Sequence, residues 1–373
     1  MRCRRLTLAT ILRVTCVVTV LSAASAVSSA CGTSSGGAAA PGPQSPADGG
    51  DPVSDGDSGS MIPGPDASGG GDADAAPTSA ARDWAAHPAI VDVPAPAVLY
   101  AVSDVHGGYD RLATLLLANK LLSSAPTKAT DAHWGGAGAT LVVTGDLIDK
   151  GPSSVEVIDF LMALQADAHA KGGLVIVTLG NHEAEFLVDP TNSKASNTDG
   201  IDTELTADGI APATLASATD PRGGWLRILP FGARVGGWFF SHAGDTGGST
   251  VAVLGAKLEA AVKAHADYND PAIVGATSIL ESRSWYTSAI VTQNAAALGV
   301  KHIVFGHDPN ALGAKGAIAT SFNDALVRID CGMSPGVDDS KGKLLRVTQQ
   351  GANDVVDELD QNGASRALFQ SPR

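Results

Sequence analysis

Four short segments of this chain combine residue types that bind metal ions. Carboxylate, imidazole and amide oxygen together are the donors that hold Mn, Fe or Zn, whereas a Ca or Mg site would be built from oxygen alone. Each segment follows an apolar run, so its ligands are expected at the end of a strand. The segments are Ser-Asp104-Val-His106-Gly-Gly, Gly-Asp146-Leu-Ile-Asp149-Lys-Gly-Pro, Gly-Asn181-His182-Glu and Ser-His242-Ala-Gly. Their order and spacing predict a hydrolytic site with two metal ions.

The candidate ligands divide between two ions that share one carboxylate. Such a carboxylate lets both ions lower the pKa of one water molecule and hold a phosphoryl oxygen for in-line attack. Asp146 is the candidate bridge. Asp104 and His106, two residues apart on an extended segment, project to the same side and are assigned to the first ion. The second ion is assigned three ligands, the last of which ends the apolar run 304–306: Asn181, His242 and His307.

Two further residues have the chemistry of an acid and its partner. His182 adjoins a ligand and is placed to protonate the leaving alkoxide as general acid. Asp149 could hold that imidazole in its protonated form through a hydrogen bond, or it could be only a turn residue before Lys150.

A phosphoryl substrate also calls for cationic donors. Arg283 is the best placed of the candidates to act as a bidentate clamp. Each candidate could instead be an ordinary surface charge. The candidates in or near the motif segments are Lys150, Arg222, Arg227 and Arg283.

Apolar patterning predicts the elements that position these residues. Helical spacing over 111–122, 155–170, 251–266 and 288–298 alternates with short apolar runs that read as buried strands. This alternation predicts an α/β layered fold, in which ligands gather at the carboxyl ends of strands. The predicted strands are 98–102, 141–144, 174–179, 235–240, 302–305, 325–330 and 344–348.

The segment 192–219 interrupts this alternation and is polar and turn-rich. Long segments of this kind in compact domains usually have a role. Two interpretations stay open: a lid or substrate-selecting insertion, and a solvated loop.

The N-terminal residues 1–31 have the pattern of a secretory signal. Arg2, Arg4 and Arg5 precede an apolar stretch, and small residues follow it. A permanent membrane anchor is disfavoured because the stretch is short and contains Arg13. Cys31 stands where a lipoprotein carries its acylated cysteine and is a candidate lipid anchor, with plain secretion as the alternative. We therefore expect an exported protein, periplasmic or on the outer surface.

Composition divides the remainder of the chain. Residues 32–81 are rich in Gly, Ala, Pro, Ser and Asp and predict a disordered tether. Residues 82–348 form the predicted catalytic domain, and 349–373 a polar tail that frays. Cys331 is the one cysteine in the domain and is expected to be buried, so no disulfide framework is predicted. The net charge of −14 disfavours nucleic acid as a partner, while the oligomeric state is not predicted.

The motifs resemble those of the calcineurin-like metallophosphoesterase superfamily, and within it the phosphoprotein phosphatase branch with Shewanella-like and ApaH-like phosphatases. The resemblance spans about 98–347. It implies a central β-sandwich flanked by helices, with ligands, general acid and partner at the positions assigned above. Lys150 stands where protein phosphatases carry a phosphate-binding Arg, and ApaH-like members share its Lys-Gly-Pro sequence.

These observations lead to three functional hypotheses. The first is a hydrolase for phosphate monoesters, on phosphoproteins in particular, with a binuclear Mn, Fe or Zn centre. The second is cleavage of phosphoanhydrides, such as polyphosphate or dinucleoside polyphosphates. The third is a non-catalytic exported binding protein, which predicts the loss of a ligand or of the general acid, and none is missing.

Overall fold

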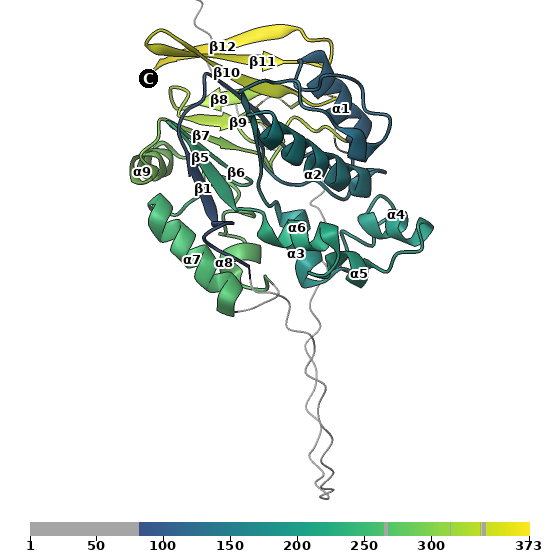
Figure 1. Ribbon diagram of the computed structural model, residues 1–373. Coiled ribbons are helices and arrows are strands. Elements are labelled where there is room, and N and C mark those ends of the chain that lie inside the picture. The colour runs from purple at the N-terminus through teal and green to yellow at the C-terminus, as the bar shows by residue number, and fades with distance from the viewer. Residues whose placement is uncertain (1–81, 265–267, 314, 336, 338–340) are drawn as a thin grey trace, which may run out of the picture. The chain divides into compact units, whose positions relative to one another are not determined.

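The computed structural model describes residues 82–264, 268–313, 315–335, 337 and 341–373. Within them, two β-sheets are stacked and flanked by helices (Figure 1). The expected signal segment 1–31, its candidate lipid anchor Cys31 and the expected tether 32–81 lie outside the described residues. Among the described residues, no helix is both long enough and apolar enough to span a membrane.

One sheet contains the strands that lead to the first three motifs. Its order is β12-β11-β10-β2-β3-β4, with β2, β3 and β4 parallel to one another and β10, β11 and β12 attached antiparallel. Because β2, β3 and β4 are parallel neighbours, their carboxyl ends lie side by side. The strands are β2 (Val98–Val102), β3 (Thr140–Val143), β4 (Leu174–Val177), β10 (Leu344–Gln350), β11 (Asn353–Leu359) and β12 (Ser365–Pro372).

The other sheet leads to the remaining motifs. Its order is β1-β5-β6-β7-β9-β8, and β6, β7 and β9 are parallel. The turn between β5 and β6 contains Gly236, whose φ of 58° suits a residue without a side chain. The strands are β1 (Ile90–Val93), β5 (Gly232–Val235), β6 (Trp238–Ser241), β7 (His302–Phe305), β8 (Ala319–Ser321) and β9 (Leu326–Arg328).

Alternation along the strands builds the core between the sheets. Leu99 and Ala101 of β2 lie in one buried cluster with residues of the opposite sheet, such as Phe240 and Val304. Their neighbour Val102 belongs to a second cluster, which packs against the helices. This arrangement is the expected β-sandwich. Cys331 is buried in the layer between the sheets, as predicted.

Helices cover the outer faces of the sheets. Helices α1 and α2 bury leucine and phenylalanine side chains in the outer cluster. The helices are α1 (Tyr109–Ala118), η1 (Ala129–Asp131), α2 (Ser154–Ala170), α3 (Asn181–Val188), α4 (Ile201–Ala207), α5 (Pro212–Ala216), α6 (Pro221–Ile228), α7 (Val251–Ala264), α8 (Pro271–Val274) and α9 (Ser288–Leu298).

Three expectations need correction. The run 235–240 is not one strand but the end of β5, a turn and most of β6. The segment 349–373 is not a frayed tail, because β10, β11 and β12 pair along their length and bury Val356 and Leu359. The segment 192–219 is not a solvated loop, because it contains α4 and α5, whose buried leucines pack into the core.

Candidate metal centre

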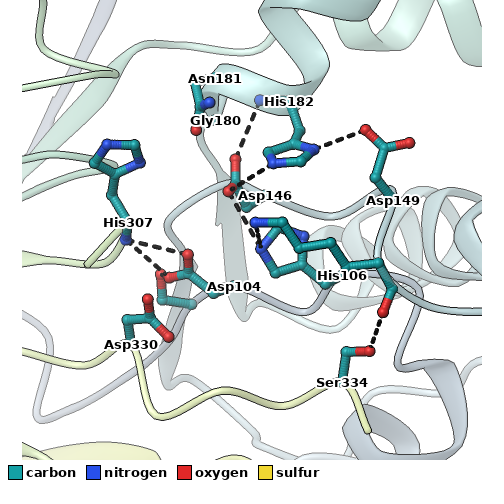
Figure 2. Close-up of polar contacts among 12 residues, drawn as sticks. Asp104, His106, Asp146, Asp149, Gly180, Asn181, His182, His307, Asp330 and Ser334 are labelled. Atoms are coloured by element: carbon teal, nitrogen blue, oxygen red, sulfur yellow. Dashed lines mark hydrogen bonds and ion pairs between the residues drawn. The ribbon is translucent and has the colours of Figure 1, made fainter. Parts of the chain in front are cut away.

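The six candidate ligands meet at one end of the sandwich, although they come from both sheets. Figure 2 labels all of them except His242. Two hydrogen bonds join the sheets there: His307 N donates to Asp104 Oδ1 at 3.1 Å, and His242 Nδ1 donates to the carbonyl oxygen of Thr144 at 2.8 Å. The strands that precede them are β2 for Asp104 and His106, β3 for Asp146, β4 for Asn181, β6 for His242 and β7 for His307.

The backbone at this end of the sandwich is strained. Left-handed φ angles cost a residue with a side chain on the order of 1–3 kcal/mol and persist where the surroundings fix them. Here His106 N donates to the carbonyl oxygen of Asp146 at 2.9 Å, which ties the first two motif loops together. Positive φ values between 46° and 66° occur at Asp104, His106, Asp146, Asp149, Lys150 and His307.

Glu183 organises the loop that carries Asp146. Its buried carboxylate accepts hydrogen bonds from Asp146 N at 3.0 Å and from Gly180 N at 2.8 Å. It also accepts from the next two amides of the loop, at Leu147 and Ile148. Burial, followed by the charge of Asp146, raises the pKa of Glu183 to about 7, although the amide bonds lower it. One side chain therefore fixes both the candidate bridge and the start of α3.

The contacts of His242 favour a cation at its inner nitrogen. Because Nδ1–H is donated to a carbonyl oxygen, a neutral ring would direct the lone pair of Nε2 inward. That atom lies 3.1 Å from Asp146 Oδ1 and 3.0 Å from Asn181 Oδ1, and both oxygens are acceptors. Burial opposes protonation of His242, but the charge and hydrogen bond of Asp146 raise its pKa to about 10. A positive charge is therefore stabilised where these three atoms converge.

The other two candidate imidazole ligands are held in their neutral form. His106 Nδ1 donates to the carbonyl oxygen of Ile148 at 2.9 Å, which leaves Nε2 3.4 Å from Asp146 Oδ2. Burial, then the charge of Lys150, lowers the pKa of His106 well below its usual value. Burial, then His242, lowers the pKa of His307 to about 2. Neutral imidazole with a backbone-bonded second nitrogen is the form that binds metals in proteins.

Asp104 is held by one backbone amide and one hydroxyl group, and its pKa is influenced by a second acid. His307 N contacts both of its carboxylate oxygens at 3.1 Å, and Ser103 Oγ donates to one of them. Burial, then the charge of Asp330, raises the pKa of Asp104 well above its usual value. A Cβ on Gly306 would collide with Ser103 and with the carboxylate of Asp104, so only glycine fits there.

His182 and Asp149 form the expected pair (Figure 2). His182 Nδ1 donates to Asp149 Oδ2 at 2.7 Å, and both side chains are buried. His182 Nε2 is directed to the ligand cluster, 3.9 Å from Asp146 Oδ2. The imidazole therefore has one nitrogen fixed and the other facing the place where a substrate would react.

The candidate ligands offer both nitrogen and oxygen donors. Such a mixed set suits borderline metals such as Mn, Fe or Zn better than a set of oxygen donors alone would. Two groups of possible ligand atoms each lie within 4.8 Å of one another, and Asp146 belongs to both, as a bridge would. His182 is one member of the first group, so geometry alone also permits it to bind a metal. The groups are His106, Asp146 and His182, and Asp146, His242 and His307.

Comparison with known proteins identifies the family. Residues 97–311, more than half of the chain, match the calcineurin-like phosphoesterase family. This chain is a calcineurin-like phosphoesterase. The family is one of metal-dependent hydrolases, and the matched residues include all six candidate ligands.

Similar proteins include phosphatases of two kinds. The Shewanella-like protein phosphatase 1 of Plasmodium berghei is 33% identical over 85 residues, which are 23% of this chain and 22% of that protein. The symmetrical bis(5'-nucleosyl)-tetraphosphatase of Citrobacter koseri is 30% identical over 131 residues, which are 35% of this chain and 36% of that enzyme. This phosphoesterase therefore aligns with less than a quarter of the first relative and little more than a third of the second.

Solved structures share the fold over a larger part of the chain. The cold-active protein tyrosine phosphatase of a psychrophilic Shewanella species has a TM-score of 0.62 at 22% identity, covering 74% of this chain and 82% of that one. A serine/threonine phosphatase from Saccharomyces cerevisiae has a TM-score of 0.51 at 14% identity, covering 77% and 86%. These likenesses support the sandwich fold of this phosphoesterase.

Of the four cationic candidates, two lie at the cluster. Lys150 Nζ is 3.2 Å from His106 Nε2, and the exposed Arg283 donates to the carbonyl oxygen of His307 at 3.1 Å. The other two are engaged elsewhere in the part of the chain that the structure describes. Arg222 forms a two-fold ion pair with Asp159 of α2, and Arg227 donates to the carbonyl oxygen of Ala216. These contacts do not place either arginine at the ligand cluster.

The sequence analysis missed some residues that shape this phosphoesterase site. Asp330 follows β9 as the ligands follow their strands, and this position could have suggested it. Ser334 donates to the carbonyl oxygen of Lys150, a contact without a sequence signal. Glu281 offers its carbonyl oxygen to His307 Nε2 at 3.2 Å. His302 lies at the start of β7, whereas His307 follows its end, and the side chain of His302 bonds Ser371 and stacks on Trp238.

Proposed function

We propose that this phosphoesterase hydrolyses phosphate monoesters, with phosphoproteins as its substrates. The observation that carries the proposal is the buried pair of His182 and Asp149 beside Asp146. A phosphoanhydride leaves as a stabilised phosphate, whereas a serine or tyrosine side chain leaves as a basic oxygen that must be protonated. A fixed imidazole with a free nitrogen at the ligand cluster suits that need.

The residues have separate tasks in this proposal. Two ions of Mn, Fe or Zn, held by the six ligands, would lower the pKa of a water molecule and neutralise the phosphoryl group. Asp149 keeps the His182 ring in one orientation, so that Nε2 can give its proton to the leaving oxygen. Arg283, which bonds the backbone of His307, and Lys150, which contacts His106, would hold the phosphate oxygens.

A second candidate function is the hydrolysis of dinucleoside polyphosphates or polyphosphate. Two observations favour it: the similarity to a bis(5'-nucleosyl)-tetraphosphatase, and Lys150, a point charge that holds phosphate less rigidly than the planar fork of an arginine. The net charge of −14 opposes a polyanionic substrate.

The cellular setting is also part of the proposal. The pattern of residues 1–31 supports export to a periplasm or an outer surface, with Cys31 as the candidate lipid anchor. Substrates would then be exported phosphoproteins or small monoesters. The acidic charge does not favour nucleic acid.

The test compares both substrate classes on the same protein. We would measure phosphate release by the full chain with Mn from phosphoserine, phosphothreonine and phosphotyrosine peptides, and from polyphosphate and diadenosine tetraphosphate. Asp146→Asn, which removes the bridge, is the blank. Peptide turnover that vanishes in the variant supports the proposal. Turnover of anhydrides alone would move the assignment to the second function, and no turnover of either class would refute both.

A further inference from the structure

Asp149 is held by three contacts, and only one of them is to His182. Its Oδ2 accepts from His182 Nδ1 at 2.7 Å, and its Oδ1 accepts from the backbone N–H of Ile201 at 3.0 Å. Its own backbone N–H donates to Ser154 Oγ at 3.1 Å. The orientation of the carboxylate therefore depends on Ile201 in α4 and on Ser154 in α2.

Glu204 connects these two supports. Its carboxylate accepts from Ser154 N at 2.6 Å and from Val155 N at 2.9 Å. These are N–H groups of the first turn of α2, which lack partners within the helix, and the side chain of Ser153 at the N-cap does not bond them. Glu204 therefore caps α2 from a different helix.

The contacts close into a ring. Ile201 and Glu204 lie one turn apart on α4, so the ring runs from Asp149 to Ile201, along α4 to Glu204, to Ser154 and back to Asp149. Its members Asp149, Ile201 and Ser154 are almost inaccessible to solvent. Gly151 N also donates to the carbonyl oxygen of Asp199, just before α4. The ring thus joins the insertion 192–219 to the loop of the second motif.

We propose that Glu204 is a positioning residue for acid catalysis, which clamps α4 to α2 and so holds Asp149 in the orientation that fixes His182. This inference rests on the proposed function, because it concerns the protonation of the leaving group. In this proposal, the insertion 192–219 holds the pair of His182 and Asp149 in position. The hydrogen bonds of Glu204 go to the first turn of α2 and not to the candidate ligands, so its effect must pass through Asp149.

The test uses the leaving group as the readout. We would compare the full-length wild type with Glu204→Ala, Glu204→Gln and Asp208→Asn, loaded with Mn. Asp208 is an exposed acid at the end of the same helix and controls for the loss of one charge. The substrates are phenyl phosphate, whose leaving group needs a proton, and 4-nitrophenyl phosphate, whose leaving group needs it less.

The expected result is a loss that depends on the substrate. Glu204→Ala should lower kcat for phenyl phosphate about tenfold, a part of the roughly 10²–10⁴-fold that a general acid supplies, and leave 4-nitrophenyl phosphate within about twofold. KM and metal content should not change. Glu204→Gln keeps one acceptor oxygen, so its kcat for phenyl phosphate should lie between those of the wild type and Glu204→Ala. If Glu204→Ala does not fold, Glu204→Gln replaces it in the test. Asp208→Asn should behave as wild type.

Several outcomes would overturn the inference. Equal losses on both substrates would show a general structural effect, and no loss would show that Asp149 does not need the clamp. Amide hydrogen exchange at Ile201 tests the ring without activity: exchange should be faster in Glu204→Ala, and unchanged exchange refutes the ring. A wild type inactive on every phosphate ester refutes the proposed function, and with it the role in acid catalysis.

Discussion

The carboxylate of Glu183 accepts a hydrogen bond from the backbone N–H of Asp146, so the candidate bridge is held through its main chain by an acid from α3. The same carboxylate binds three further amides, at the start of α3 and in the second motif loop. Charge-assisted bonds to backbone N–H groups are strong in a buried setting. The geometry of the candidate metal site therefore depends on a residue that is not among the candidate ligands.

Glu183→Gln should weaken both metal binding and folding. Glutamine offers one acceptor oxygen, whereas the four N–H groups share the two oxygens of the carboxylate. Two buried N–H groups would therefore lose their acceptor. We expect metal affinity to fall by about 10–100-fold and the free energy of unfolding to fall by roughly 1–3 kcal/mol. Metal titration by calorimetry and urea unfolding measure these two effects. Glu259→Gln, on the surface of α7, is the control and should change neither. Unchanged metal affinity in Glu183→Gln would contradict this role.

His182→Asn should distinguish the role of His182 as general acid from a role as metal ligand. Without the acid, turnover of phenyl phosphate should fall by about 10²–10⁴-fold, while 4-nitrophenyl phosphate should lose far less. Bound metal, measured by mass spectrometry after desalting, should equal that of the wild type. Asp146→Asn is the comparison and should lose metal and activity together. If His182→Asn also lost a metal ion, His182 would be a ligand, as its place beside His106 and Asp146 permits.

Arg283→Ala should affect substrate binding more than the chemical step. Arg283 is exposed beside His307 and pairs only loosely with Asp308, at 3.7 Å, so it is available to a phosphate. We expect KM to rise by about tenfold, as for the loss of one charge-assisted contact worth roughly 1.5–3 kcal/mol. Arg283→Lys should recover part of this loss, because lysine keeps the charge without the fork. Arg222→Ala is the matched control: it breaks the pair with Asp159 and should leave KM unchanged.

The stability of the fold should depend on the titration of Glu204. Burial, then a hydrogen bond with Glu156, raises the pKa of Glu204 to about 8. A carboxyl group whose pKa is raised on folding contributes most to stability below its unfolded pKa, and this contribution is lost as the pH rises through the folded value. The Tm of the wild type should therefore fall relative to that of Glu204→Gln between about pH 5 and pH 9. A constant or growing difference in Tm over this range would count against the raised pKa. Glu156→Gln should reduce the slope.

The sequence was sufficient to predict which candidate ligands lie together, because each follows a short apolar run. Val142 and Val304, for example, mark strands whose ends carry Asp146 and His307, and the layered fold follows from the same runs. The local pattern of apolar residues thus predicts both the strands and the edge of the sheet at which the candidate ligands lie.

The residues that the sequence did not reveal depend on contacts between distant elements. Arg222 was a candidate phosphate ligand because it is a basic residue near the motif segments. The sequence gives no sign of its ion pair with Asp159, which lies 63 residues away on α2. Glu204 looked like one more acid of a polar segment, because the amides that it caps belong to another helix. The strand β12 has a largely exposed, polar pattern, and only its pairing with β11 makes it a strand.

The position of β10 in its sheet has a consequence for the order of folding. β2, which leads into Asp104, is flanked by β3 on one side and by β10 on the other, and Ala101 pairs with Leu345 near the end of the chain. Contacts between residues so far apart in sequence form late and slowly. During synthesis, the sheet that supports the first motif therefore stays open at one edge until β10 has been made.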